Sequence, residues 1–279
     1  MHKTLKIIQI LSLDVVTGSM AIGYLAVRLL DVSPNAWWWI ILPMSVWTIY
    51  SVDHLFDGYK LRSKGKIERH NYYFRNRFIL IPIIVLLSFS SLVLSFLYLE
   101  TRIIIGGLIL GLLCTVYFLI INFTRITFRR TVPKELVIAF IYATGIFLAP
   151  FVWGIDTINP TSVFVFIIIG LLAFSEGVMI SYFDFDLDLA DGHSSFTTSF
   201  GRNQTRRFLL VLHLIIEISL LIALFKSEIN LFFICFILLL IMNFILAMLT
   251  MVTPGRYILK YHKLIGESVF LLPAILWFF

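Results

Sequence analysis

The stretch Thr161–Phe183 reads TSVFVFIIIGLLAFSEGVMISYF, and the stretch Asp184–Asp191 that follows reads DFDLDLAD. The first carries one charged residue, Glu176, and a bilayer crossing takes about 20 mostly apolar residues, so we predict a membrane-spanning helix. In the second, Asp184 and Asp188 are four positions apart, which places two carboxylates on one face of a helix. We therefore expect a span that ends in an acidic pair at the membrane surface.

The composition points to a membrane protein throughout. Of the 279 residues, 60% are hydrophobic and 14% are charged, whereas a soluble domain carries about 25% charged residues. The mean hydropathy is +0.97. Because no polar segment is long enough for a separate soluble domain, residues 1–279 are predicted to form a single membrane domain. The net charge of +6 would suit nucleic acid, but the placement of these charges argues against such a partner.

Apolar stretches of spanning length recur along the chain, and the fold class that they predict is all-α. The predicted spans are approximately 8–30, 36–56, 78–99, 103–123, 133–153, 161–183, 207–226, 229–251 and 262–279. We therefore expect a polytopic bundle of nine transmembrane helices embedded in a lipid bilayer. An odd number of spans places the two ends of the chain on opposite sides.

The basic residues set the expected orientation. Nineteen of the 22 Lys and Arg residues fall on one side of the predicted topology, in the N-terminal segment and the longer loops. The other three, Arg28, Arg102 and Lys226, flank the short loops on the opposite side. Basic loops face the cytoplasm, so the N-terminus is predicted to be cytoplasmic and the C-terminus outside.

A second acidic pair has the same spacing as the first. It reads Asp53-His-Leu-Phe-Asp57 at the end of the predicted span 36–56, and the topology places it on the cytoplasmic side with Asp184 and Asp188. Mg²⁺ accepts one or two carboxylates and completes its octahedron with water and substrate phosphate oxygens. Two facing pairs predict two Mg²⁺ ions with a diphosphate between them. The alternative is that these helix-end aspartates face water or form ion pairs with nearby Lys and Arg.

Two motifs resemble those of a known family. Asp184–Gly192 followed by Ser199–Arg202 is similar to the second aspartate motif and trailing glycine of the UbiA-type intramembrane prenyltransferases. Asp53–Gly58 resembles the later part of that family's first motif, Asn-x-x-x-Asp-x-x-x-Asp. The nine spans and their orientation also match, so the resemblance extends over essentially the whole chain.

The resemblance implies a helical bundle around a central cavity, where Mg²⁺ and an isoprenyl diphosphate bind beneath cytoplasmic loops. The implied reaction transfers the prenyl group, an alkyl group other than methyl, to an aromatic or other lipophilic acceptor. The implied location is a bacterial inner membrane, with the active site facing the cytoplasm. One alternative is a UbiA-type terpene cyclase that acts on the isoprenyl diphosphate itself. An alternative from another class is a cation-coupled transporter, although a transporter places its charges near the bilayer midplane.

The sequence also departs from the family pattern. The position of the leading asparagine is occupied by Ile49, which cannot bind metal or diphosphate, with Tyr50 beside it. The family's Tyr-x-x-x-Lys element is not evident either, because Tyr117 is followed four positions later by Ile121. These departures leave the metal and diphosphate chemistry in place but make the acceptor harder to predict.

Individual roles follow from the motifs and from charge. Asp53 and Asp57 are expected to hold one Mg²⁺, and Asp184 and Asp188 the other, with Asp191 as an additional ligand. The residues expected to contact the substrate are Tyr50, Lys60, Arg69, Arg129, Lys134 and Glu176. Intramembrane carboxylates such as Glu176 are costly and by default functional, and a cation-stabilising or proton-accepting role is expected for it.

Overall fold

The structure is a computed structural model that describes residues 3–62, 65–123, 133–228, 231–255 and 258–278. Every regular element in these ranges is a helix, which confirms the all-α prediction. The long helices are α2 (Leu13–Leu29), α3 (Trp38–Leu61), α5 (Arg77–Tyr98), α6 (Thr101–Phe123), α7 (Lys134–Trp153), α8 (Pro160–Phe183), α11 (Arg202–Lys226) and α12 (Leu231–Met251). The shorter ones are α1 (Lys3–Ile10), α4 (Glu68–Arg75), α9 (Phe185–Asp191), α10 (Phe196–Phe200), α13 (Ile258–Val269) and the 3₁₀ helix η2 (Leu272–Phe278).

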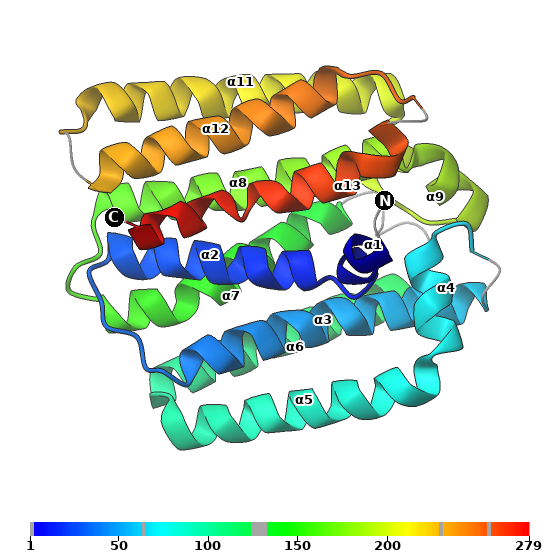
Figure 1. The fold of residues 1–279 in the computed structure, drawn as a ribbon, viewed down its shortest axis with the longest axis horizontal. Helices are drawn as coiled ribbons and strands as arrows, with labels where there is room; N and C mark the ends of the chain where they lie inside the picture. The colour runs from blue at the N-terminus through cyan, green and yellow to red at the C-terminus, as the bar shows by residue number, and fades with distance from the viewer. Residues whose placement is uncertain (1–2, 63–64, 124–132, 229–230, 256–257, 279) are drawn as a thin grey trace.

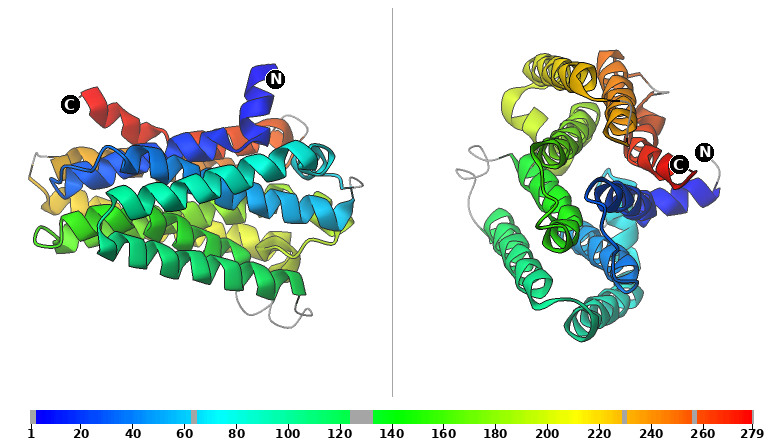
Figure 2. Two further views of the ribbon diagram at one scale, coloured as in Figure 1. Left: turned by 90° about the horizontal axis from the view of Figure 1, so that it is seen from below. Right: turned by 90° about the vertical axis from the view of Figure 1, so that its left-hand side faces the viewer.

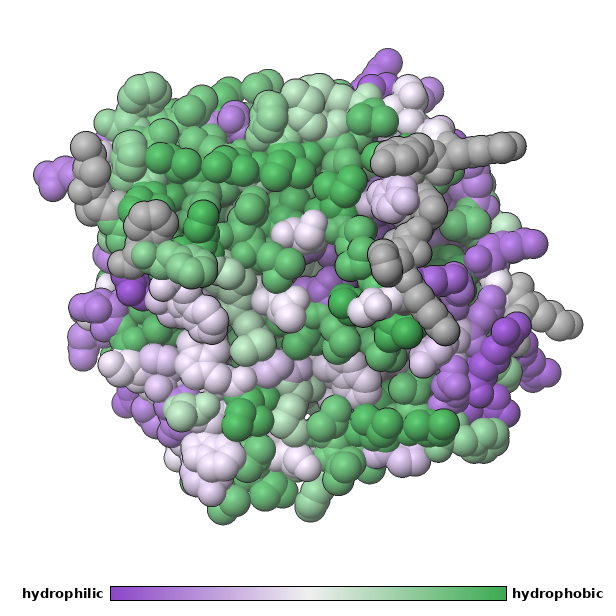
Figure 3. All heavy atoms as spheres, in the orientation of Figure 1, coloured by the Kyte–Doolittle hydropathy of each residue, from purple (hydrophilic) through white to green (hydrophobic). Residues whose placement is uncertain are grey.

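The long helices run lengthwise beside one another, and the short helices α1, α4 and α9 gather at one end of the bundle (Figure 1). The two further views show the same bundle from the side and end-on (Figure 2). Hydrophobic residues cover most of the flank seen in Figure 3, while hydrophilic residues concentrate towards the end that carries α4 and α9. An apolar flank of this extent is unsuited to water and fits a surrounding bilayer.

Six helices in the described ranges are long and apolar enough to cross a membrane: α5, α6, α7, α8, α11 and α12. The pair α1 and α2 gives a seventh span if the two are counted together across their 73° bend. Helix α3 is long, but Asp53, Asp57 and Lys60 in its last turns reduce its hydropathy. The predicted span 262–279 is divided between α13 and η2. A polytopic all-α protein is thus confirmed, and the count of nine spans stays a prediction.

A close approach of α4 to α3 depends on Gly58. A Cβ atom on this residue would lie 2.6 Å from the carbonyl oxygen of His70, so only glycine lets the two backbones pack at this distance. Helix α3 ends at Leu61, and the next residue, Arg62, has a left-handed φ of 47°. The contact places α4 against the turn of α3 that carries Asp57.

The segment that carries the second aspartate pair has well-defined helix ends. Helix α8 begins with a capping box between Asn159 and Ser162, and Pro160 occupies the first turn. Helix α9 ends at Gly192, whose φ of 68° is the left-handed conformation that glycine adopts at a helix C-terminus. Ser195 then begins α10 with a second capping box. These helix caps determine where α9 and the turn after it lie at the end of the bundle.

Candidate active site

The four paired aspartates line one cavity at the bundle end. The cavity has a volume of about 200 Å³ and is bordered by α3, α4, α7, α8, α9 and α13. Asp53 and Asp57 enter it from α3, and Asp184 and Asp188 enter it from the α8–α9 junction. The amide of Asp188 donates to the carbonyl of Asp184 at 2.8 Å, so the expected one-turn relationship holds across the junction. The structure therefore brings the two motifs together.

One carboxylate of the second pair, Asp184, has basic neighbours from α13. The Asp184 carboxylate lies 2.6 Å from the Lys263 ammonium and 3.3 Å from Nε2 of His262. Burial alone would raise the pKa of Asp184, but Lys263 and His262 outweigh it and hold that pKa well below its usual range. Asp188 differs, because burial raises its pKa despite Lys134 and a hydrogen bond from Ser195. The negative charge of Asp184 is thus stabilised by basic groups of the protein itself.

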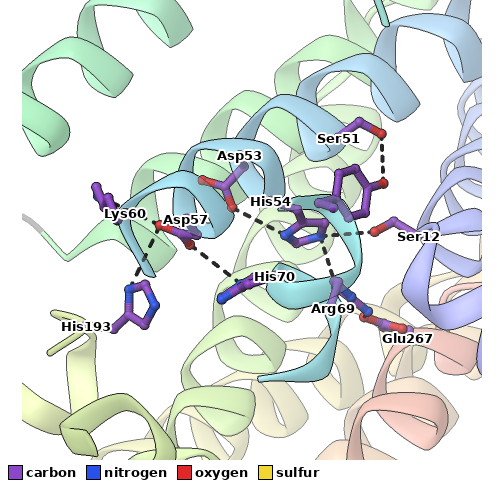
Figure 4. Close-up of polar contacts among 11 residues, drawn as sticks. Ser12, Ser51, Asp53, His54, Asp57, Lys60, Arg69, His70, His193 and Glu267 are labelled. Carbon is purple, nitrogen blue, oxygen red and sulfur yellow. Dashed lines mark hydrogen bonds and ion pairs between the residues drawn. The ribbon is translucent and has the colours of Figure 1, made fainter. Parts of the chain in front are cut away.

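The first pair is surrounded by histidines. Asp57 lies 3.7 Å from Nε2 of His70 and 3.9 Å from Nδ1 of His193, and Asp53 lies 3.9 Å from Nδ1 of His54 (Figure 4). Burial lowers the pKa of His70 to about 3 and also lowers that of His193. Both imidazoles are therefore neutral at physiological pH, and the nearest ion-pair partner of Asp57 is the Lys60 ammonium at 3.7 Å.

Arg69 connects α4 to α13 and to α3. It donates to Nε2 of His54 at 3.1 Å and lies 3.4 Å from Glu267, and Ser12 contacts the same His54 nitrogen at 3.1 Å (Figure 4). Burial would lower the pKa of Arg69, but Glu267 and Asp14 raise it overall. Arg69 lines the cavity as expected of a substrate-binding residue, and it also has protein partners of its own.

Four further predicted residues lie around the same cavity. Tyr50, Lys134 and Glu176 line it, with Lys134 at the first turn of α7. Tyr50 and Glu176 lie about two helical turns deeper in the bundle than Asp57 and Asp184. Lys60 lies 3.7 Å from Asp57 and borders an adjoining cavity. A diphosphate in the cavity would meet cations from α3, α7 and α13.

Asp191, predicted as an additional metal ligand, does not line this cavity and borders the adjoining one instead. Both carboxylate oxygens of Asp191 accept from the backbone amide of Lys66, at 2.8 and 2.9 Å, so this side chain joins the segment after α3 to the end of α9. Asp186, between the two aspartates of the second pair, is exposed and pairs with Arg202 at 3.1 Å. Arg129 lies outside the described residues.

Two further cavities adjoin the aspartate cavity, and one of them is mainly apolar. A cavity of about 400 Å³ lies among α3, α5, α6 and α7, and Tyr50, Ile138 and Tyr142 border both it and the aspartate cavity. Ile49, at the position of the family's asparagine, faces this apolar cavity and does not line the aspartate cavity. Another cavity, of about 380 Å³, shares Asp53 and Asp57 with the aspartate cavity. These volumes fall within the range of about 300–1,000 Å³ typical of small-molecule sites.

Sequence reasoning missed several residues of the site. His54, His193 and His262 were assigned no role, and Lys263 was counted only as a topology signal, yet all four line the cavity or contact its aspartates. His54 and His193 directly follow Asp53 and Gly192 of the two motifs, so proximity to a motif was the available signal. His262 and Lys263 lie in a distant helix and carry no local signal.

Comparison with solved structures identifies the fold. A UbiA homolog from Archaeoglobus fulgidus bound to GPP and Mg²⁺ superposes with a TM-score of 0.62 and 13% sequence identity, over 97% of this chain and 96% of that one. The same homolog bound to DMAPP and Mg²⁺ gives a TM-score of 0.63 and 14% identity over the same shares. No protein-family model matches the sequence, and no curated protein matches it either. The chain therefore has the UbiA fold, as the two motifs predicted.

Proposed function

We propose that this chain is a Mg²⁺-dependent intramembrane prenyltransferase of the UbiA superfamily, which ionises an isoprenyl diphosphate and transfers the prenyl group to a lipophilic acceptor. The observation that carries the proposal is the junction between a cavity with four aspartates and an apolar cavity of about 400 Å³, at Tyr50, Ile138 and Tyr142. A diphosphate and its hydrocarbon tail need these two environments side by side. The UbiA homolog of the same fold binds GPP or DMAPP with Mg²⁺.

The residues present fit Mg²⁺. Carboxylate oxygens are the protein ligands that Mg²⁺ takes, and the aspartates of both pairs line the same cavity. Asp53 and Asp57 would hold one ion, and Asp184 and Asp188 the other. Bound Mg²⁺ would supply Lewis-acid neutralisation of the diphosphate oxygens.

The chain's own residues account for the rest of the proposed reaction. The ammonium groups of Lys134 and Lys263 bind diphosphate oxygens and favour cleavage of the allylic C–O bond, whose electron pair leaves with the diphosphate. Tyr50 and Tyr142 present aromatic rings at the junction, where an allylic cation is stabilised by their π faces. Glu176 accepts the proton that the acceptor releases when its new bond to the prenyl carbon forms. The apolar walls exclude the water that would otherwise capture the cation.

The finer topology belongs to the same proposal. We place nine spans across a bacterial inner membrane, with α3 and the α13–η2 segment among them, the N-terminus and the aspartate cavity facing the cytoplasm, and residues 1–279 as one domain. The bias of basic residues towards the end that carries the aspartates supports this orientation. The acceptor is proposed to be an aromatic or other lipophilic molecule that enters from the bilayer.

The test is release of diphosphate by the purified protein in detergent. Labelled C10, C15 and C20 isoprenyl diphosphates are supplied with Mg²⁺, with and without a lipid extract. We expect release that EDTA abolishes and that Asp53→Asn and Asp184→Asn remove, while the exposed Asp186→Asn serves as the matched control. No release with any chain length and any acceptor pool would overturn the proposal. Product analysis separates transfer from cyclisation, since a cyclised hydrocarbon formed without acceptor identifies a terpene cyclase.

A further inference from the structure

Three side chains from separate segments converge at the first aspartate pair. Asp57 comes from α3, His70 from α4 and His193 from the turn after α9, and Figure 4 shows both imidazoles directed at the Asp57 carboxylate. Nε2 of His70 lies 3.7 Å from Oδ2, and Nδ1 of His193 lies 3.9 Å from Oδ1. One ligand atom from each residue lies within 4.8 Å of the other two.

These distances fit a shared ion better than a hydrogen bond. Hydrogen bonds between nitrogen and oxygen span about 2.7–3.2 Å, so 3.7 and 3.9 Å are too long. Two ligands that each lie about 2.1 Å from one metal ion are separated by up to about 4.2 Å. Each imidazole nitrogen thus lies within the separation from the carboxylate that one small cation can bridge.

Two glycines fix the approach of the histidines. Gly58 lets α4 pack so closely that a Cβ atom there would meet the His70 carbonyl oxygen at 2.6 Å. Gly192, with its φ of 68°, reverses the chain after α9, and the His193 amide then donates to the carbonyl of Asp188 at 2.8 Å. The backbone conformations at Gly58 and Gly192 therefore position His70 and His193 beside Asp57.

We infer that Asp57, His70 and His193 bind one divalent transition-metal ion, of the class of Mn²⁺, Fe²⁺, Co²⁺ or Zn²⁺, which takes the place of the Mg²⁺ proposed above for the first pair. Imidazole nitrogen suits this class, whereas Mg²⁺ takes oxygen ligands almost exclusively. Two histidines and one carboxylate leave open coordination positions, which a diphosphate oxygen fills. Lys60 lies 3.7 Å from the same carboxylate, so the metal competes with this ammonium until a diphosphate binds beside both. The role of the metal in ionising a prenyl diphosphate rests on the proposed function; the binding of the metal does not.

The test measures metal binding directly. Chelator-stripped protein in detergent is titrated with Co²⁺, with and without inorganic pyrophosphate, and ligand-field absorption reports nitrogen coordination; Zn²⁺ and Mg²⁺ are then added as competitors. We expect one Co²⁺ per chain, displaced by Zn²⁺ at far lower concentration than by Mg²⁺. His70→Asn and His193→Asn should each weaken Co²⁺ binding at least about tenfold. His213→Gln is the matched control, because His213 lies on α11 and is hydrogen-bonded to Asn243.

A second pair of variants guards against loss of folding. His70→Asp and His193→Asp replace nitrogen by oxygen donors, so competition should shift in favour of Mg²⁺ while elution from a sizing column is unchanged. Co²⁺ binding that survives both Asn variants, or a wild type that binds Mg²⁺ but no Co²⁺ under either condition, overturns the inference. Histidine-dependent Co²⁺ binding without any turnover overturns the proposed function alone. Turnover with Mg²⁺ but no histidine-dependent binding overturns the metal assignment alone.

Discussion

The two aspartate pairs share a spacing and a cavity, yet their surroundings differ. Asp184 is held by the Lys263 ammonium at 2.6 Å and by His262 at 3.3 Å, both from α13. Asp57 has Lys60 at 3.7 Å and two neutral histidines at 3.7 and 3.9 Å. Asp184 of the second pair therefore has a close, fixed positive charge, whereas Asp57 of the first pair has a more distant ammonium and two neutral imidazoles.

This difference shows that an acidic motif does not define its ion by itself. The neighbours supplied by α4, α13 and the turn after α9 decide whether a carboxylate is neutralised by protein, by a hard ion with oxygen ligands, or by an ion that accepts nitrogen. The first pair is also the half whose sequence departs from the family, since Ile49 replaces an asparagine.

The largest expected effect comes from removing a charge in either pair. Asp57→Asn and Asp184→Asn should each reduce diphosphate release about 10²–10³-fold, the loss typical of a single group that stabilises charge in a transition state. The rates are measured by diphosphate release at saturating Mg²⁺, with Asp186→Asn as the control. A loss confined to one variant would break the comparison, because it would mean that one pair alone serves the reaction.

The next effect is on stability, and it depends on pH. Lys263→Met leaves Asp184 buried without its ammonium partner, which should cost about 3 kcal/mol of unfolding free energy at pH 7. Because the pKa of Asp184 is lowered in the folded protein, this contribution is complete above the ordinary aspartate range near pH 4 and disappears as the pH falls towards the lowered value.

Melting temperatures of the wild type and of Lys263→Met in detergent, measured over a pH series, check this expectation. The two curves should be well separated at pH 7 and converge below about pH 4. Lys226→Met, at an exposed position in the last turn of α11, is the control and should follow the wild type. A gap that stays constant down to low pH would show that Lys263 stabilises the fold without Asp184.

A smaller effect should follow from crowding α4. Gly58→Ala places a Cβ atom 2.6 Å from the His70 carbonyl oxygen and should cost about 1–3 kcal/mol as α4 is displaced. It should also weaken Co²⁺ binding at the first pair and leave Asp184 with its partners. Gly107→Ala on α6 is the matched control, since no atom lies within 4 Å of its added Cβ. Equal melting temperatures for the two variants would contradict the close contact of α3 and α4.

The smallest effect concerns Asp191. Asp191→Asn retains one acceptor for the Lys66 amide, so we expect a loss of about 1 kcal/mol or less and little change in diphosphate release. Melting temperature and turnover are measured together with those of Asp184→Asn. A fall in turnover as large as that of Asp184→Asn would instead make Asp191 a metal ligand, as the resemblance to the family implies.

Local spacing predicted part of the geometry of the candidate site. The i,i+4 relationship of Asp184 and Asp188 follows from helical geometry, and the topology placed both aspartate pairs at the same end of the bundle. The convergence of His70 and His193 on Asp57 could not be predicted, because it depends on how α4 and the turn after α9 pack onto α3. Such long-range packing leaves no periodic signal in one sequence.

The ends of the predicted spans show a similar limit to what the sequence can predict. The span 8–30 is interrupted at Ser12, a non-glycine residue in the left-handed region with a φ of 54°, and hydropathy does not signal such a break. The span 262–279 is divided because α13 stops at Val269, four residues before Pro273. Proline clashes with the carbonyl four positions earlier, so this break had a readable signal.

The bond between Arg69 and Glu267 joins residues 198 positions apart. Chains grow at roughly 5–20 residues per second, so roughly 10–40 s separate the synthesis of Arg69 from that of its carboxylate partner. During this interval the α4 guanidinium and the aspartates of α3 are at the membrane without the charges of α13. Assembly of the cavity is therefore one of the last events in the biogenesis of this protein, and a ribosome that stalls before α13 leaves a bundle whose most polar interior is still open.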